Sequence, residues 1–72
     1  MAGNDSTLET IAATLRTERK ARGLSQEAFA ELLGVSRPYL SELESGRGTI
    51  QLRRLIRALN AVGVDLVPVK RT

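Results

Sequence analysis

The chain has 72 residues, a length that fits one small domain with a single modest hydrophobic core. It contains no cysteine and no histidine, which excludes disulfide stabilisation, a zinc site and the usual His-based or Cys-based catalytic arrangements. Eleven Lys and Arg against eight Asp and Glu give a net charge of +3, which suits a polyanionic partner. A core of this size needs further stabilisation, and without disulfides or zinc we expect it to come from oligomerisation. No apolar run is long enough to cross a bilayer, so we expect a cytoplasmic protein.

Four segments combine an N-capping residue, an apolar repeat at helical spacing and a glycine just beyond the end. These predicted helices cover residues 7–22, 26–33, 37–45 and 50–62. Ser6 precedes the first of them and forms a capping box with Glu9. Residues 1–5 are small and polar, so we expect them to form a disordered N-terminus.

Each predicted helix has an apolar side that we expect to face a shared core. The residues on these sides are Leu8, Ile11, Ala12, Leu15, Ala28, Phe29, Leu32, Leu33, Leu40, Leu43, Leu52, Leu55, Ile56, Leu59 and Val62. Arg19 continues the apolar stripe of the first helix, which places it against the edge of the core. Only Val35 separates Gly34 from the next cap, Ser36, so the second and third helices must bend sharply on each other. This is the spacing of a helix-turn-helix.

Residues 64–69, VDLVPV, are rich in β-branched residues and are predicted to form a short strand. No second strand is predicted in the chain, and an isolated apolar strand is not stable. We therefore expect this strand to pair with its own copy across a two-fold axis, which makes the protein a homodimer. The side chains of this dimerisation strand are Val64, Leu66, Val67 and Val69. The alternative is an extended tail; residues 70–72 are expected to form a tail in either case.

The third predicted helix carries polar residues on the side opposite Leu40 and Leu43. A helix fits the major groove of B-DNA, and residues near its N-terminus reach the base edges. Arg37 can bond guanine O6 and N7 together, and Glu42 can accept a hydrogen bond from cytosine N4. The predicted base-reading residues are Ser36, Arg37, Pro38, Ser41 and Glu42. The alternative for these side chains is an ordinary solvated helix face.

Residues on either side of this helix are predicted to contact DNA phosphates, because helix N-termini and basic loops bind anions. These residues are Ser25, Gln26, Tyr39, Ser45 and Arg47. Three further cations, Arg53, Arg54 and Arg57, lie opposite the apolar side of the fourth helix. They form either a solvated surface or a contact for an acidic protein partner or a neighbouring phosphate.

The stretch LSQEAFAELLGVS, followed by LESGR at the end of the next helix, resembles the Xre/Cro/CI-type helix-turn-helix repressors over about residues 8–64. The resemblance implies a mainly α, four-helix, lambda-repressor-like domain over residues 6–63 that binds palindromic double-stranded DNA. It implies a phosphate contact for Gln26 and a structural ion pair between Arg19 and Glu44, which accounts for the arginine in the apolar stripe. Pro38 departs from the family pattern because it lacks a side-chain amide, so the operator sequence is not carried over.

Four short helices followed by GVDLVPV are similar to the compact HipB-type antitoxins, whose terminal strands pair across the dimer. This resemblance implies a bacterial, nucleoid-associated repressor that restrains a HipA-type kinase toxin and needs no cofactor or metal. Two alternatives stay open: a stand-alone Xre-type repressor without a toxin, and a helix-turn-helix protein-interaction module that has lost DNA binding. An enzyme is disfavoured, since a Ser-Lys pair through Lys20 or Lys70 has no partner that the sequence places nearby.

Overall fold

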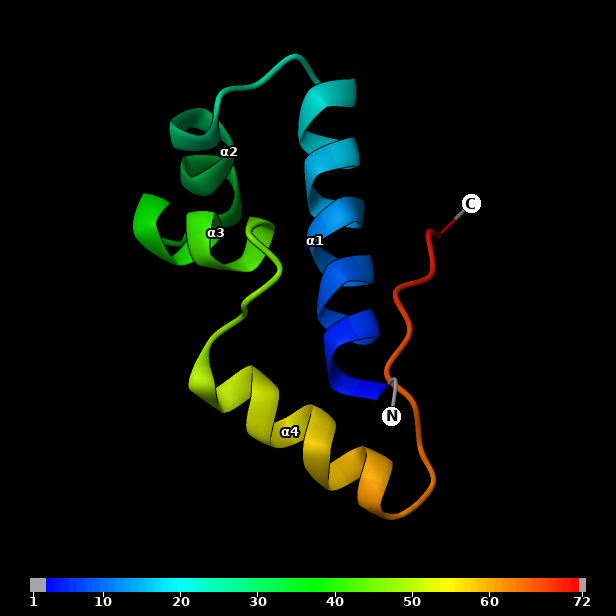
Figure 1. Cartoon of the computed structure of the whole chain (residues 1–72). Helices are drawn as coiled ribbons and strands as arrows, with labels where there is room; N and C mark the ends of the chain where they lie inside the picture. The colour runs from blue at the N-terminus through cyan, green and yellow to red at the C-terminus, as the bar shows by residue number, and fades with distance from the viewer. Residues whose placement is uncertain (1–2, 72) are drawn as a thin grey trace.

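The computed structural model describes residues 3–71, with the side chains of residues 7–71, and it contains four helices in this part of the chain (Figure 1). They are α1 (Gly3–Ala21), α2 (Gln26–Leu33), α3 (Arg37–Glu44) and α4 (Ile50–Ala61). The prediction of a mainly α, four-helix domain is confirmed, and the bounds of α2, α3 and α4 agree with the predicted ones within about one residue. None of the described helices is both long and apolar enough to span a membrane.

α1 begins at Gly3, so Ser6 lies within the helix and is not its N-cap. Asn4 and Asp5 are as well suited to a helix start as Ser6, and a capping-box pattern alone therefore does not fix where this helix begins. Residues 3–5, which we expected to be disordered, belong to α1. Residues 1 and 2 of that predicted terminus lie outside the described residues.

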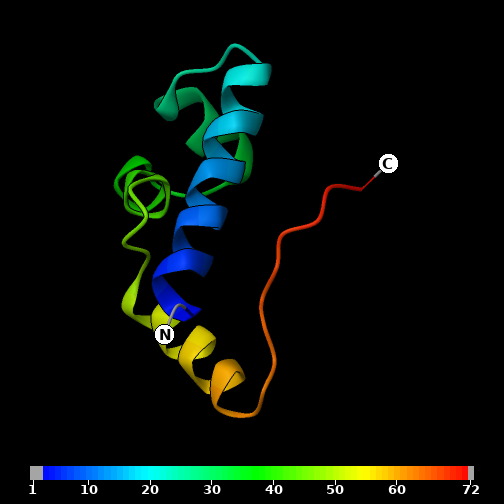
Figure 2. The same cartoon turned by 45° about the vertical axis from the view of Figure 1, so that its right-hand side comes forward.

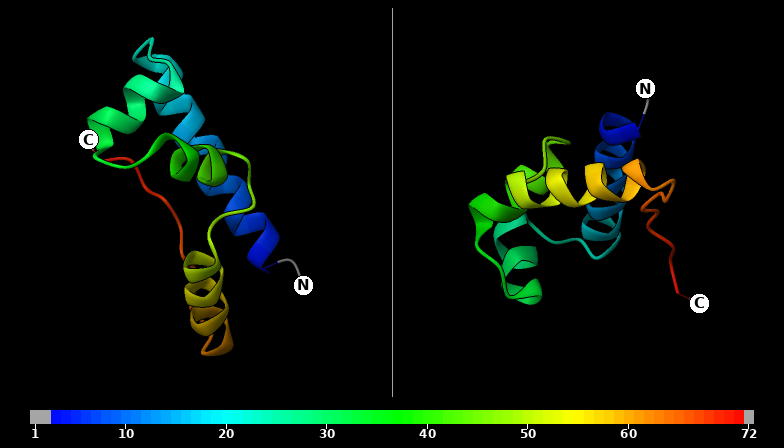
Figure 3. Two further views of the ribbon diagram at one scale, coloured as in Figure 1. Left: turned by 90° about the vertical axis from the view of Figure 1, so that its left-hand side faces the viewer. Right: turned by 90° about the horizontal axis from the view of Figure 1, so that it is seen from below.

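The hydrophobic core lies where α3 packs against α1 and α2, while α4 packs against the N-terminal end of α1 (Figures 1 and 3). The buried apolar residues are Leu8, Ala12, Phe29, Ala30, Leu40 and Ile56. Leu15, Leu24 and Val35 pack, partly buried, around Phe29, Ala30 and Leu40. The predicted core side of α1, Val35 in the turn and the inward direction of Leu40 and Ile56 are confirmed. Ala30 is a core residue that the sequence pattern did not select.

Four apolar residues that we expected in the core are instead exposed: Leu32, Leu33, Leu55 and Val62. α2 has only eight residues, and Phe29 and Ala30 already fill its contact with α3, so the two leucines at its end have nothing to pack against. On α4, Ile56 faces α1, whereas Leu55 is 49% exposed and Val62 is 73% exposed. Helical periodicity identified the apolar side of α4 but not that α1 is too narrow to cover all of it.

The predicted strand over residues 64–69 is absent: residues 3–71 contain no strand, and residues 64–71 form an extended segment. This segment turns back beside α1 (Figure 2) and is attached there by an ion pair between Lys70 Nζ and Glu18 Oε2 at 3.2 Å. A strand needs a hydrogen-bonded neighbour, and a single copy of this chain supplies none. Val64, Val67 and Val69 are consequently exposed.

The loop between α3 and α4 is held tightly against α1. Gly48 is buried with a φ of 70°, and a Cβ atom at this position would lie 2.6 Å from Leu8 Cδ2. Only glycine combines this left-handed backbone with such a close approach. Arg53 Nη1 donates to the carbonyl oxygens of Arg47 and Gly48, at 2.9 and 3.1 Å, and fixes the same loop from the side of α4.

Candidate nucleic-acid interface

A rigid turn joins α2 to α3. Gly34 ends α2 with a φ of 76°, and its backbone N–H donates back to the carbonyl oxygens of Ala30 and Glu31. Val35 N donates to Ala30 O at 3.0 Å, which keeps the turn to the minimum length. Leu40 of α3 has 0% exposure and anchors that helix on Phe29 and Ala30 of α2. The two helices therefore form a helix-turn-helix unit with α3 on the outside of the molecule.

The exposed side of α3 carries the predicted base-reading residues. Arg37, Pro38 and Glu42 are exposed, and Ser41 is partly buried. The side chains of Arg37 and Glu42 make no hydrogen bond or ion pair with any residue in the described part of the chain. A guanidinium fork and a carboxylate, both without protein partners, are thus available at one surface. Arg37 is the first residue of α3, the position from which a docked helix reaches base edges.

Ser36 has a structural role in addition to its predicted one. Its hydroxyl oxygen accepts a hydrogen bond from Tyr39 N at 3.2 Å and caps α3. The hydroxyl proton is not used by this bond, so Ser36 can still donate to a base or phosphate. Pro38 sits in the first turn, where its missing N–H costs no helical hydrogen bond.

The predicted phosphate contacts fall into two groups. Ser25 caps α2 by accepting from Ala28 N at 3.1 Å, and Gln26, the first residue of α2, is partly buried. The side chain of Gln26, which is predicted to bind phosphate, also has a partner within the protein: its Nε2 donates to Glu44 Oε1 at 3.1 Å. This bond brings the start of α2 to the end of α3.

The second group follows α3. Ser45 Oγ donates to Glu42 O at 2.7 Å and accepts from Arg47 N at 3.2 Å, which orders the turn after the helix. The Arg47 side chain is exposed and has no partner among residues 3–71, and Tyr39 is 43% exposed on the flank of α3. Arg47 thus presents a cation beside the helix-turn-helix unit.

The structure contains the ion pair that the resemblance implied. Arg19 Nε lies 3.0 Å from Glu44 Oε2 and 3.2 Å from Oε1, and the side chains are 16% and 3% exposed. Arg19 Nη1 also donates to Leu24 O at 3.2 Å. Burial raises the pKa of Glu44, but the hydrogen bonds from Arg19 and Gln26 outweigh it and hold that pKa below its ordinary value. Glu44 is therefore ionised at neutral pH.

Sequence reasoning missed Arg16. Its Nη1 donates to the backbone carbonyl oxygen of Glu44, at the C-terminal end of α3. A cation at that end satisfies a free carbonyl group and interacts favourably with the helix dipole. The sequence does indicate this contact through the spacing of Arg16 from Arg19, because residues three apart lie on the same side of a helix.

The three arginines on α4 do not act together. Arg53 is tied to the loop after α3, whereas Arg54 and Arg57 are exposed and have no partner in the described part of the chain. Only two of the three predicted cations are therefore available to a partner or a phosphate.

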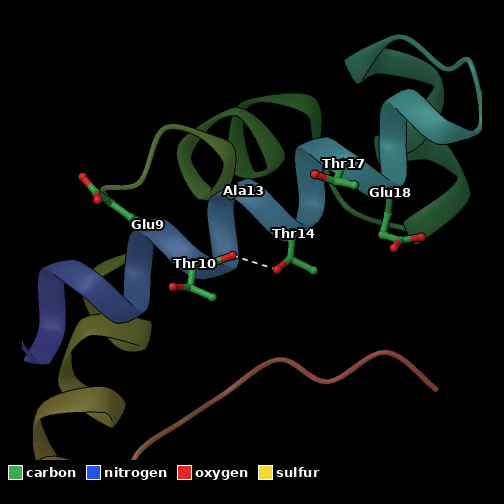
Figure 4. A pocket seen from close by; sticks show the side chains of 6 residues that line it. All are labelled: Glu9, Thr10, Ala13, Thr14, Thr17 and Glu18. Atoms are coloured by element: carbon green, nitrogen blue, oxygen red, sulfur yellow. Dashed lines mark hydrogen bonds between the residues drawn. The ribbon is translucent and has the colours of Figure 1, made fainter.

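A groove runs along one side of α1, and all the residues that line it belong to this helix (Figure 4). Its lining residues are Glu9, Thr10, Ala13, Thr14, Thr17 and Glu18. None of these residues belongs to α2 or α3, so the groove is separate from the exposed side of α3.

A tight helix-turn-helix with an exposed, partly cationic outer helix defines the class of DNA-binding helix-turn-helix domains. The family profile described as "Helix-turn-helix" matches residues 15–69. The chain therefore belongs to this family of Xre-type helix-turn-helix regulators, which bind DNA.

Named relatives agree with this assignment. The chain is 36% identical over 62 residues to the ImmF control region 10 kDa protein of Bacillus phage phi105, covering 86% of this chain and 69% of the relative. It is 30% identical over 66 residues to the HTH-type transcriptional regulator y4mF of Sinorhizobium fredii, covering 92% and 87%. It is also 37% identical over 54 residues to the propionyl-CoA carboxylase regulator of Cereibacter sphaeroides, but these residues are only 12% of that longer protein. No solved structure matches the chain.

Proposed function

We propose that the protein is a sequence-specific transcriptional repressor that binds a palindromic operator as a homodimer, with α3 of each copy in the major groove. The observation that carries this proposal is the exposed side of α3, where Arg37 and Glu42 have no partner among the described residues. The fixed turn at Gly34 and the buried Leu40 hold that side in one orientation, as direct reading of bases requires.

In the proposed complex Arg37 reads a guanine through O6 and N7, and Glu42 accepts from a cytosine N4 amino group. Ser36 and Ser41 donate or accept more permissively, and Pro38 makes an apolar contact such as one with a thymine methyl group. Phosphates are held by the predicted set at both ends of the helix-turn-helix: Ser25, Gln26, Tyr39, Ser45 and Arg47.

The dimer is supported by apolar surface that one copy leaves exposed. Val64, Val67 and Val69 of the extended segment are 45%, 63% and 80% exposed, and Leu55 of α4 and Val62, which caps the end of α4, are exposed as well. Exposed apolar side chains in this number favour an interaction site, and a small core gains stability when a second copy covers them. Pairing of the two 64–69 segments would supply the hydrogen-bonded neighbour that a single copy lacks. A two-fold dimer places the α3 helices about one turn of DNA apart, roughly 34 Å.

We further propose an antitoxin role, in which the repressor restrains a HipA-type kinase toxin. The similarity of GVDLVPV to HipB-type antitoxins supports this role, and the exposed Arg54 and Arg57 offer cations to an acidic partner surface. A stand-alone repressor is the second candidate. The relative from Bacillus phage phi105 favours it, because that protein is named for a control region and not for a toxin partner.

A salt titration of binding to random duplex DNA tests the DNA-binding proposal against an interaction module that has lost DNA binding. A dimer that makes about six phosphate contacts loses about a thousandfold in affinity between about 50 and 200 mM salt. Weak binding with a flat salt dependence would contradict the proposal.

A further inference from the structure

We infer that Glu44 is a positioning residue for DNA binding: its buried carboxylate holds the Gln26 amide in the orientation that presents an N–H to a backbone phosphate. This inference rests on the proposed DNA-binding function and adds a role to Glu44 beyond its ion pair with Arg19.

The carboxylate of Glu44 connects three helices. It accepts from Arg19 Nε of α1 at 3.0 and 3.2 Å and from Gln26 Nε2 of α2 at 3.1 Å, while Glu44 itself ends α3. The backbone carbonyl of the same residue accepts from Arg16 of α1. The Glu44 side chain is only 3% exposed, so these groups and not water satisfy it.

The charge of Glu44 decides which end of the Gln26 amide faces it. An ionised carboxylate only accepts hydrogen bonds, so it selects Nε2 of Gln26 and excludes Oε1. One N–H of the amide is directed at Glu44, and the planar NH₂ group directs the other about 120° away. Gln26 is only partly buried, so this second N–H can reach a phosphate at the N-terminus of α2. An amide without this bond would expose its oxygen as well as its NH₂ group before a phosphate arrives, and would have to be ordered on binding.

The local charge is compatible with a phosphate. One carboxylate, Glu44, lies among two guanidinium groups, Arg16 and Arg19, which leaves a net charge of +1. Arg19 thus prevents the positioning carboxylate from repelling the anion. The pair can therefore fix Gln26 without lowering the affinity for DNA.

A double-mutant cycle tests the inference. Binding of the full chain to a random duplex is measured at one salt concentration for the wild type, Gln26→Ala, Glu44→Asp and the double variant, each corrected for its folded fraction. Glu44→Asp keeps the negative charge but shortens the side chain by one methylene, which withdraws the carboxylate from both Gln26 and Arg19. The correction for the folded fraction removes the resulting loss of stability from the comparison. We expect Gln26→Ala to weaken binding about 3- to 10-fold for each bound copy of the chain, as for one lost hydrogen bond per copy. Glu44→Asp should weaken binding by most of the same factor, and the double variant should bind no more weakly than Gln26→Ala.

Ile56→Val is the matched control, because it destabilises the core from α4 without touching Gln26 or Glu44. In this background Gln26→Ala should keep its full effect. An equally full effect in the Glu44→Asp background would overturn the inference, since Glu44 would then act on stability alone. Should Glu44→Asp fail to fold, the contact is tested in the wild type by following the NMR chemical shifts of the Gln26 side-chain amide as the pH is lowered. They should change as Glu44 is protonated, and unmoved signals would overturn the inference. Wild-type binding that is insensitive to salt would instead refute the DNA-binding function itself, a result distinct from binding without coupling.

Discussion

Replacing Arg19 by methionine should destabilise the fold by about 2–4 kcal/mol. Breaking a buried ion pair by removing one partner costs about 3–5 kcal/mol, because the other charge stays buried. Here Gln26 Nε2 still donates to Glu44, which offsets about 1 kcal/mol of that cost. A chain of this length is stabilised by about 4–11 kcal/mol in total, so the variant should lose a large share of its stability.

The pH dependence of this loss separates a buried charge from lost packing. Burial raises the pKa of Glu44, yet the hydrogen bonds from Arg19 and Gln26 keep the pKa below its ordinary value of 4.5. The wild type thus has the full contribution of ionised Glu44 above pH 4.5 and loses it as the pH falls through the lower folded-state pKa. In Arg19→Met burial dominates, the pKa rises, and protonation relieves the buried charge. The stability difference between the two proteins should therefore shrink from about pH 7 to about pH 3.

Urea denaturation followed by circular dichroism measures both quantities, at one protomer concentration because a dimer's stability depends on it. Arg22→Met is the control, since the Arg22–Glu18 pair is exposed and of the kind worth about 0–1 kcal/mol. A loss for Arg19→Met that matches the control, or one that stays constant with pH, would refute the buried-charge account.

Three further predictions concern the loop, the α3 surface and the dimer. Gly48→Ala should destabilise the fold by about 1–3 kcal/mol, because the new Cβ atom would meet Leu8. The control is Gly23→Ala, whose Cβ atom would meet nothing within 4 Å and which should cost only about 1 kcal/mol of backbone strain. Equal losses of stability in thermal unfolding would contradict the close packing at Gly48. Arg37→Ala should reduce the binding free energy for the operator by about 1–3 kcal/mol and relax the preference at one base pair, while Gln26→Ala should weaken binding to all duplexes alike. Fluorescence anisotropy measures both affinities. An equal loss of affinity of Arg37→Ala for operator and random DNA would refute base reading. Val64→Asp with Leu66→Asp should give a folded monomer with lower operator affinity, and a dimer that persists in sedimentation would place the contact elsewhere.

The helices were predictable because their signals are local. Ser25, Ser36 and Thr49 accept from the backbone N–H three residues on, and glycines with positive φ follow each of the four helices. Such caps depend only on neighbouring residues, so the sequence places them within about one residue. The start of α1 is the exception, because several adjacent residues can begin a helix there.

Burial was less predictable, because it depends on what stands opposite each helix. Leu55 and Val62 follow the helical spacing of a core side, yet α1 covers Ile56 and leaves them exposed. Periodicity gives the direction of a side chain but not the width of the surface that meets it. The same reason applies to residues 64–69, whose β-type composition is clear but whose pairing needs a neighbour from outside the single chain.

The candidate site was predictable at the level of the motif. The exposed residues of α3 follow from the turn spacing and the helix wheel. The bonds of Glu44 to Gln26 and Arg16 do not, because they join residues 18 and 28 positions apart in the sequence. Only the packing of α3 against α1 and α2 shows that a residue expected to bind phosphate is held by a buried carboxylate.

The central claim is that α3 of a two-fold dimer reads DNA bases, and selection of duplexes from a random pool by the wild type and by Arg37→Ala tests it most directly. The wild type should enrich a palindrome with half-sites about one helical turn apart, and Arg37→Ala should lose the preference at one base pair in each half-site. Enrichment of no sequence, or of the same sequence by both proteins, would contradict the account.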